Sequence, residues 1–418
     1  FGSSFSGLRL QGQPLSCCVE PPPASWRPML PLLLVALGQL PAMLVWAAPV
    51  GPLREDDACL AAAEGAASGS GPACGVGLLQ QEARKRAEGS ADERQLAPVM
   101  QAAVCTGFGG LCADPTTCNL HLERIHVQSV PRPRPGQGQA LVEVAASSVN
   151  PIDWKTLPTF QGVLGRDFAG RVVSWVPPCS LEVGDLVWGD HLHGGAYGDY
   201  LAVGCGQLGL RPTGISAAEA GAMPHVALAT LQALKDAGAP WATSPTVLVL
   251  GGSGGTGHVG IQLAKAFGAG KVITTTSPSH FDMVKSLGAD QVIDYHTENW
   301  WQVTSAIDVI YDCVGEARAG EHAYRVLRNG GTFVTLLPDK SVRASVVTAF
   351  VRPQVHQVFS SLSHISRASL DTLKDLVDKG QLKVIIGTAY NRSEVKQAFK
   401  DSREGKAVGK IAIRVRDE

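Results

Sequence analysis

The sequence predicts an α/β protein whose C-terminal half contains a doubly wound parallel sheet. Two observations carry this prediction. A glycine-rich turn at residues 252–257 separates a short apolar strand from an apolar helix. Strands and helices then alternate up to about residue 337. Such alternation is typical of sheets in which each helix connects two parallel strands.

The chain has 418 residues, which gives room for two or three domains with ample core. Its formal net charge is −1, from 36 basic and 37 acidic residues, so no bulk field favours nucleic acid, and we expect no nucleic-acid partner. None of the ten cysteines forms a C-x-x-C pair, which argues against a zinc ribbon or a thioredoxin-like site. A disulfide framework is not expected in a chain of this size, and we interpret the cysteines mostly as small buried residues.

Residues 1–99 are expected to be a targeting or linker region. Residues 29–50 form an uncharged apolar run that follows Arg27 and is interrupted by prolines and a glycine. It suits a secretory-type signal better than a membrane span, although membrane association through it stays open. Residues 51–98 are rich in Ala, Gly and Ser and specify no core. Because the chain begins with Phe1, we expect its natural N-terminus to lie further upstream.

From residue 100 onward, alternating apolar and polar residues predict strands. The segments 100–108, 120–130 and 140–149 have this pattern, and a Pro/Gly turn at 131–139 separates the last two. The alternation is of the kind expected for antiparallel sheets, which bury one face.

The turn itself reads Gly252-Ser253-Gly254-Gly255-Thr256-Gly257, which fits G-x-G-x-x-G. The strand before it is residues 246–250, and Val259, Leu263 and Phe267 form an apolar stripe on the helix after it. Gln262 and Lys265 fall outside this stripe. Glycine lets a pyrophosphate approach the backbone, and a helix N-terminus offers unpaired N–H groups. A structural turn would explain the glycines alone, but the flanking strand and helix favour dinucleotide binding.

Strands are predicted at residues 271–276, 288–295, 306–315 and 330–337, with a helix at 281–287. Ligands of such sheets bind at the carboxyl ends of the strands, so Cys313 and Leu336, near two of these ends, are candidate cofactor contacts.

The second strand predicts the cofactor to be NADPH. NAD-specific sites place an acidic residue at the end of this strand, where Thr276 and Ser277 stand here. Ser277 and His280 can donate hydrogen bonds to a 2′-phosphate. Asp282, on the next helix, would reverse this prediction if it turned inward.

Several motifs occur in a fixed order along the rest of the chain. They are SSVNPIDWK (147–155), GVLGRDFAGRVV (162–173), EVGDLVWG (182–189), GGAYGDYLAV (194–203) and a C-terminal GKAVGK (405–410). Residues 100–416 therefore resemble the medium-chain dehydrogenase/reductase superfamily, in its zinc-independent quinone-oxidoreductase branch. VKSLGADQVIDY, FVTLL and GKAVGK are most similar to the reticulon-interacting protein group of NADPH-dependent oxidoreductases.

The resemblance implies a GroES-like β-barrel catalytic domain at residues 100–221 and 383–418 and a Rossmann domain at 222–382. The active site would lie in the cleft between them. It also implies a homodimer, a mitochondrial location, and an adenine or ribose contact from Tyr295.

Zinc-dependent relatives carry a Cys where Asn150 stands and Gly-His-Glu where residues 165–167 stand, so the resemblance implies no metal. His191 and His193 are interpreted as loop residues. Without a Lewis acid, the chemistry that remains is hydride addition to a conjugated acceptor, either a quinone or an α,β-unsaturated ketone. The physiological substrate is left undefined.

The catalytic candidates are Asn150, Asp153, Lys155 and Tyr197, which could stabilise the oxyanion that develops on the substrate. Structural roles are equally open, because Asn150 could hold a loop, Asp153 could cap a turn, and Lys155 could be solvated. Trp154 stands where many quinone reductases carry a tyrosine. An alternative function therefore stays open: a nucleotide-binding redox sensor or scaffold protein without turnover.

Overall fold

The computed structural model describes residues 96–107, 122–157, 160–337, 354–360, 365–405 and 407–416. The apolar run at 29–50 and the rest of the N-terminal region up to residue 95 lie outside the described residues. Within the described part of the chain, no helix is both long and apolar enough to cross a membrane.

A six-stranded sheet forms the nucleotide-binding half, with all strands parallel in the order β11-β10-β9-β12-β13-β14. Chain order reverses at β9, which lies between β10 and β12, so the predicted doubly wound sheet is confirmed. β14 was not anticipated. The strands are β9 (Thr246–Leu250), β10 (Lys271–Thr276), β11 (Gln291–Asp294), β12 (Ile307–Asp312), β13 (Leu327–Thr335) and β14 (His356–Phe359).

Helices connect these strands. Val259 and Leu263 of α6 are fully buried, as the predicted apolar stripe requires, and α6 ends at Ala266 before Phe267. Gln262 was expected to lie outside this stripe, but it is buried because its amide bonds the backbone of Lys383 in both directions. The helices are α5 (Pro224–Asp236), α6 (Gly257–Ala266), α7 (Phe281–Ser286), α8 (Trp300–Val303), α9 (Ala319–Val326) and α12 (Arg367–Asp378).

The rest of the described chain forms a largely antiparallel seven-stranded sheet. Its order is β15-β16-β3-β5-β6-β8, and β7 also pairs with β3. The strands are β3 (Gln139–Val149), β5 (Asp167–Trp175), β6 (Leu186–Asp190), β7 (Tyr200–Gly204), β8 (Leu208–Leu210), β15 (Ile386–Asn391) and β16 (Lys410–Arg414). A smaller sheet has the order β2-β1-β4, from β1 (Val99–Cys105), β2 (Ile125–Pro131) and β4 (Gly162–Val163).

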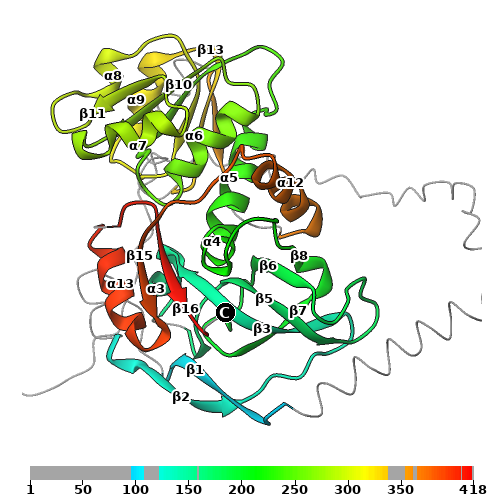
Figure 1. Cartoon of the computed structure of the whole chain (residues 1–418). Coiled ribbons are helices and arrows are strands. Elements are labelled where there is room, and N and C mark those ends of the chain that lie inside the picture. Colours follow the sequence, from blue (N-terminus) through cyan, green and yellow to red (C-terminus); the bar gives the residue numbers. More distant parts are fainter. Residues whose placement is uncertain are drawn as a thin grey trace, which may run out of the picture. The chain divides into compact units, whose positions relative to one another are not determined.

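The C-terminal strand β16 pairs antiparallel with β3, although about 260 residues separate their bonded positions (Figure 1). Three further helices belong to this half: α3 (Pro151–Lys155), α4 (Ala217–Ala222) and α13 (Val395–Arg403). The pairing of β16 with β3 agrees with a catalytic domain built from both ends of the described chain. The boundaries at 221/222 and 382/383 stay predictions.

One pair of cysteines departs from the expectation of free buried thiols. Cys179 and Cys205 form a disulfide, with their Cα atoms 5.6 Å apart. They meet because the segments after β5 and β7 both bond Gly138, at the start of β3: Gly138 N donates to Val176 O, and Cys205 N donates to Gly138 O. Cys105 is a free, buried thiol, as predicted.

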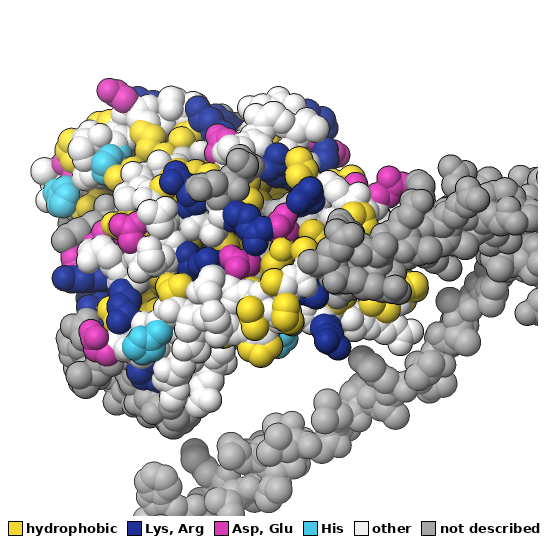
Figure 2. All heavy atoms as spheres, turned by 60° about the horizontal axis from the view of Figure 1, so that its bottom comes forward, with side chains coloured by type: hydrophobic (Ala, Val, Ile, Leu, Met, Phe, Trp, Pro, Cys, Tyr) yellow, Lys and Arg dark blue, Asp and Glu magenta, His cyan; other side chains and the backbone are white. Residues whose placement is uncertain are grey.

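Charged side chains of both signs lie among one another on the face drawn in Figure 2, with hydrophobic side chains between them. This mixture agrees with the formal net charge of −1. On this face, electrostatics does not single out one extended acidic or basic area.

Candidate functional site

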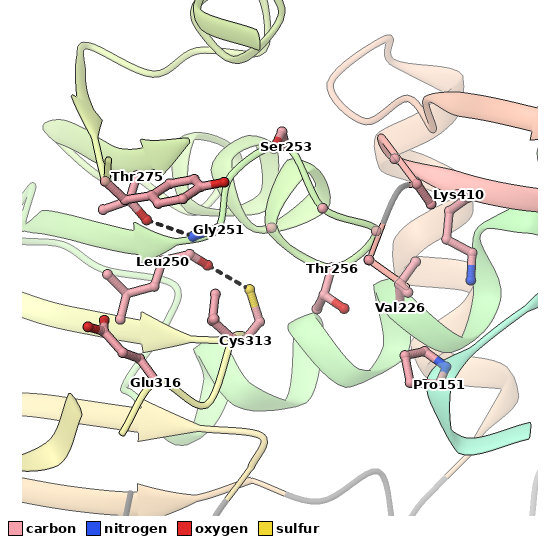
Figure 3. Close-up of a pocket in the computed structure, with 18 of the residues that line it drawn as sticks. Pro151, Val226, Leu250, Gly251, Ser253, Thr256, Thr275, Cys313, Glu316 and Lys410 are labelled. Atoms are coloured by element: carbon pink, nitrogen blue, oxygen red, sulfur yellow. Dashed lines mark hydrogen bonds between the residues drawn. The ribbon is translucent and has the colours of Figure 1, made fainter. Parts of the chain in front are cut away.

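A cavity of about 670 Å³ lies against the glycine turn (Figure 3). Its lining on one side comes from the strand ends and the turn, which we call the turn side: Leu250, Gly251, Ser253–Gly257, Thr275 and Cys313. Its lining on the other side, which we call the amide side, comes from Val149, Asn150, Pro151, Lys410 and Ile411. The cavity therefore joins the parallel sheet to β3, α3 and β16.

The glycines of the turn have two different roles. A Cβ at Gly252 would overlap Thr274 Oγ1, and a Cβ at Gly257 would overlap Gly251 O, so these two glycines let the strand and the helix pack closely. Gly254 and Gly255 face the cavity, where a Cβ at Gly255 would lie 3.1 Å from Gly409 O. Gly252 and Gly257 thus serve the packing of the strand and the helix, whereas Gly254 and Gly255 expose backbone to the cavity.

Hydrogen bonds hold the turn in place. Gly251 N donates to Thr275 Oγ1 at 2.9 Å, Gly252 N donates to Thr275 O at 2.9 Å, and Thr276 Oγ1 donates to Ser253 Oγ at 2.8 Å. The first N–H groups of α6 have no carbonyl within the helix to bond, and the helix dipole is positive at this end. This side of the cavity is suited to an anionic group such as a pyrophosphate.

His258, in the first turn of α6, links the glycine turn to the chain before β15. Its Nδ1 lies 2.9 Å from Gly254 O, and Ile385 N donates to its Nε2 at 3.1 Å. These contacts require the neutral tautomer with the proton on Nδ1. Burial lowers the pKa of His258 to about 4, so the imidazole is neutral at pH 7.

The predicted cofactor residues divide into two groups. Tyr295 and Cys313 line the cavity with the middle of the turn. The Cys313 thiol donates to Leu250 O at 2.9 Å, and burial raises its pKa, so it stays protonated. The cavity lining does not include Gly252, Ser277, His280 or Leu336.

Each of these four residues has another position. Gly252 packs behind the turn, and Leu336 packs against the hydrophobic core. Ser277 and His280 lie just beyond the end of β10, where Ser277 Oγ is 3.0 Å from Ser279 Oγ.

On the amide side, Asn150 precedes α3 and is fully buried. Asp153 caps this helix, because its Oδ2 accepts from Asn150 N at 2.8 Å. The Asn150 amide donates through Nδ2 to Asp167 Oδ2 at 2.7 Å and accepts through Oδ1 from Lys410 Nζ at 2.5 Å. Burial raises the pKa of Asp153 to about 7.

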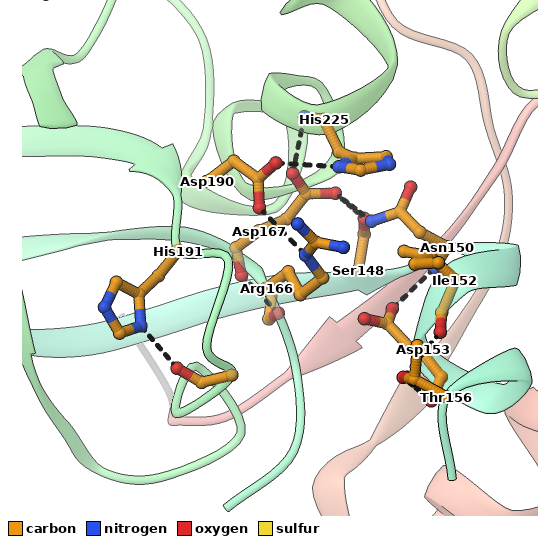
Figure 4. A network of polar contacts seen from close by, with 12 residues as sticks. Ser148, Asn150, Ile152, Asp153, Thr156, Arg166, Asp167, Asp190, His191 and His225 are labelled. Atoms are coloured by element: carbon orange, nitrogen blue, oxygen red, sulfur yellow. Dashed lines mark hydrogen bonds and ion pairs between the residues drawn. The ribbon is translucent and has the colours of Figure 1, made fainter. Parts of the chain in front are cut away.

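Behind Asn150 lies a buried network of charges (Figure 4). Asp167 also accepts from Ser148 Oγ and from His225 N, each at 2.6 Å. Asp190 Oδ2 lies 2.7 Å from His225 Nδ1, and Asp190 Oδ1 lies 3.5 Å from Arg166 Nε. Burial would raise the pKa of Asp190, but His225 and Arg166 outweigh it and hold that pKa below its usual value.

Comparisons with known proteins agree with this architecture. Residues 136–233 match the family described as "Alcohol dehydrogenase GroES-like domain", and residues 287–413 match "Zinc-binding dehydrogenase". The chain is 34% identical over 300 residues to the 2-methylene-furan-3-one reductase of Solanum lycopersicum, covering 66% of this chain and 72% of that protein. The chain belongs to the medium-chain dehydrogenase/reductase superfamily.

Further members of the superfamily are similar. The chloroplast envelope quinone oxidoreductase homolog of Arabidopsis thaliana is 32% identical, over 69% of this chain and 93% of that protein. The mitochondrial NAD(P)H oxidoreductase RTN4IP1 of Mus musculus is 29% identical, over 76% and 89%. The quinone oxidoreductase structure from Coxiella burnetii has a TM-score of 0.66 at 27% identity, over 76% of this chain and all of that one.

These matches confirm the predicted superfamily and its two-part fold, a GroES-like domain with a Rossmann domain. The reticulon-interacting group is among the relatives, as expected.

One family description mentions zinc, but the side chains on the amide side do not fit a zinc ion. The Asp167 carboxylate is already bonded to Ser148, Asn150 and His225, and the Lys410 ammonium lies 3.6 Å from it. Among the described residues, no three His, Cys, Asp or Glu side chains are grouped as a metal site. His191 Nδ1 is 2.5 Å from Gly194 O in its own loop.

Three of the four predicted catalytic residues, Asp153, Lys155 and Tyr197, are not in the cavity lining, and Asp153 caps α3. Lys155 is exposed at the end of α3, where its ammonium lies 5.7 Å from the ring centre of Trp154. Tyr197 is fully buried, and its hydroxyl donates to Ser148 O at 3.0 Å. The cavity lining includes neither residue, and their catalytic roles stay predictions.

Sequence reasoning missed Lys410, His258, Asp190 and His225 as residues of the site. In the sequence, Lys410 is the last residue of the GKAVGK motif and directly precedes the apolar run IAI, but the motif assigned it no role in the site. A lysine at the start of an apolar strand was the one available signal, because a buried lysine needs a specific partner.

Proposed function

We propose that this protein is a zinc-independent NADPH-dependent oxidoreductase that transfers hydride to a quinone or an α,β-unsaturated carbonyl compound. One observation carries the proposal: a single cavity joins a dinucleotide-type glycine turn to the buried Asn150 amide and the Lys410 ammonium. Relatives named as quinone oxidoreductases and as a furanone reductase support the substrate class.

The turn side would hold the nicotinamide dinucleotide. The backbone of Gly254, Gly255 and Thr256 would surround the pyrophosphate, and Cys313 and Tyr295 line the same cavity. When bound, the reduced nicotinamide supplies the hydride.

The amide side would bind the acceptor oxygen. As hydride adds to the β-carbon of an enone, the electron pair moves onto the carbonyl oxygen, and a proton from solvent then completes the α-carbon. A preorganised amide N–H stabilises the charge that develops on this oxygen. Asn150 lines the cavity and fits this role, whereas Asp153 acts on Asn150 by capping α3.

The preference for NADPH over NADH is a separate part of the proposal. β10 ends at Thr276 and is followed by Ser277, so neither position carries the acidic residue of NAD-specific sites, and His280 follows three residues later. Glu298 and Glu316 line the cavity and argue the other way, because they would repel a phosphate placed near them. Initial rates measured with NADPH and with NADH decide which of the two cofactors the protein prefers.

The test uses the full chain after metal depletion. We expect oxidation of NADPH that depends on a short quinone or a cyclic enone, with a higher kcat/KM than for NADH. Tight nucleotide binding without turnover on either substrate class would instead identify the alternative function, a redox sensor or scaffold. The absence of Lys155 and Tyr197 from the cavity lining is the observation that keeps this alternative open. Full activity restored only by added zinc would contradict the zinc-independent part.

We also propose that the protein is a homodimer and acts in an organelle. Relatives named for the chloroplast and for the mitochondrion support an organelle, with the mitochondrion as the sequence-based prediction. Imaging a fluorescent protein fused after residue 99 tests the location and any membrane association through residues 29–50. Light scattering of the purified chain tests the dimer.

A further inference from the structure

Gly409 brings Lys410 to the cavity. Gly409 N donates to Ser253 O at 2.8 Å, and Lys410 N donates to Ile385 O at 2.8 Å. Gly409 has φ of +61°, and a Cβ there would overlap Ile385 O, so only glycine fits without strain. The backbone before β16 is thus held against the glycine turn, and this contact sets where the Lys410 side chain begins.

The Lys410 side chain is buried, with a relative exposure of 3%. Its ammonium bonds residues of the amide side rather than the glycine turn. Nζ donates to Val149 O at 3.0 Å and to Asn150 Oδ1 at 2.5 Å, and it lies 3.6 Å from Asp167 Oδ2. Two of the three N–H groups of the ammonium are therefore bonded to Val149 and Asn150, and the Asp167 carboxylate lies close enough for an ion pair. These contacts direct the Lys410 ammonium toward Asn150 and Asp167.

The consequence falls on Asn150. The side-chain amide of Asn150 could be placed with its oxygen and nitrogen exchanged. Here the Lys410 ammonium can only donate, so it faces the amide oxygen, and the Asp167 carboxylate can only accept, so it faces the amide N–H; one orientation is therefore fixed. Nδ2 has a second N–H, and within the described residues no acceptor is bonded to it. This N–H belongs to a residue that lines the cavity.

We propose that Lys410 is a positioning residue for the Asn150 amide: it fixes the side-chain orientation of Asn150 and places a buried positive charge behind the N–H that meets the substrate oxygen. This inference rests on the proposed reductase function. A charge held at low dielectric acts more strongly on a developing oxyanion than it would in water, and no reorganisation is needed during the reaction. Lys410 acts through Asn150 and need not touch the substrate.

A purely structural role gives a different expectation. Lys410 and Arg166 face Asp167 and Asp190, so Lys410 could serve only to balance buried charge. In that case its removal would lower stability and leave kcat unchanged. The positioning role instead predicts a loss of kcat that depends on Asn150.

The experiment compares Lys410→Met, Asn150→Ala and their combination in the full chain, with Lys400→Met as the control on the exposed face of α13. The measured quantities are kcat and KM for an enone, the Kd for NADPH from nucleotide fluorescence, and the melting temperature. We expect Lys410→Met to lower kcat about 10- to 100-fold, with Kd changed less than threefold. The double variant should be no slower than the slower single variant, and Lys400→Met should match the wild type.

The following outcomes overturn the inference. A kcat within twofold of wild type in Lys410→Met, or additive losses in the double variant, would contradict it while the reductase function stands. Absence of any wild-type turnover would remove the proposed function and this inference with it. Should Lys410→Met fail to fold, Lys410→Gln and Lys410→Arg replace it. A kcat that falls in Lys410→Gln and is partly restored in Lys410→Arg supports the inference. Equal kcat values in these two variants contradict it.

Discussion

The two sides of the cavity are built from different parts of the polypeptide. The turn side uses the backbone of one continuous segment, residues 250–257, held by Thr275 and by a neutral histidine. The amide side uses Asn150, which lies between β3 and α3, and Lys410 of β16, with Arg166 and the buried Asp167 of β5 and Asp190 of β6 behind them. The difference shows that the proposed nucleotide site depends on shape close to the backbone, whereas the proposed oxyanion site depends on buried charge.

Substitution within the turn should have the largest effect. Gly255→Asp places a Cβ within 3.1 Å of Gly409 O and a carboxylate in the proposed pyrophosphate site. We expect the Kd for NADPH to rise by at least about 100-fold, equivalent to ~3 kcal/mol or more. Gly206→Asp is the control, since a Cβ at this exposed position meets nothing within 4 Å. Equal nucleotide affinity in the two folded variants would refute the assignment of the turn.

Loss of the amide should separate the two sides. Asn150→Ala removes the N–H proposed for the substrate oxygen, and we expect kcat to fall about 100-fold. The Kd for NADPH should change less than threefold, because Asn150 makes no bond to the turn in the described chain. Stopped-flow kinetics measure kcat, and nucleotide fluorescence measures the Kd for NADPH. A parallel loss of nucleotide affinity would show that the sides do not act separately.

The pH dependence of stability should have opposite signs on the two sides. On the amide side, burial raises the pKa of Asp153 to about 7. Between pH 4 and 7 the folded chain therefore binds one more proton than the unfolded chain, and raising the pH lowers the free energy of unfolding. On the turn side, burial lowers the pKa of His258 to about 4, so raising the pH from 4 to 6.5 increases stability.

Asp153→Asn keeps an oxygen to accept from Asn150 N and removes the titration. We expect the variant to lose less stability than the wild type between pH 5 and 8, by a difference on the order of 3 kcal/mol. Urea unfolding of both proteins at four pH values measures the free energy of unfolding and its dependence on pH. Identical pH slopes for the two proteins would show that Asp153 does not titrate in this range.

The smallest effect concerns cofactor choice at the edge of the turn side. His280→Ala should lower the ratio of kcat/KM for NADPH to that for NADH by less than about fivefold, because His280 lies beyond the cavity lining. His356→Ala on β14 is the control. A wild-type preference for NADH would overturn the NADPH assignment.

The turn side could be predicted from the sequence because its determinants are local. A strand, six residues of turn and a helix follow one another in the chain, and glycine has few other reasons to cluster between them. The predicted strands appear within a few residues of their observed ends. β14 was missed because no turn or alternation signal marked it.

The amide side could be predicted only in part, because its side chains meet through tertiary structure. Asn150 was found from its motif, but Lys410 bonds it across 260 positions of sequence. Lys155 was predicted from the motif that also contains Asn150 and Asp153, but its side chain is exposed at the end of α3, and its catalytic role stays a prediction. The Cys179–Cys205 disulfide likewise depends on pairing of β5 and β7 with β3, which no local pattern reveals.

The central claim is that hydride passes from a nucleotide on the turn side to an acceptor on the amide side. The most direct measurement incubates the metal-depleted full chain with a cyclic enone and NADPH carrying deuterium at the nicotinamide C4, and analyses the product by mass spectrometry and NMR. The account predicts one deuterium at the β-carbon of the saturated ketone. A chain that binds the nucleotide but yields no deuterated product with any enone or quinone would contradict the account.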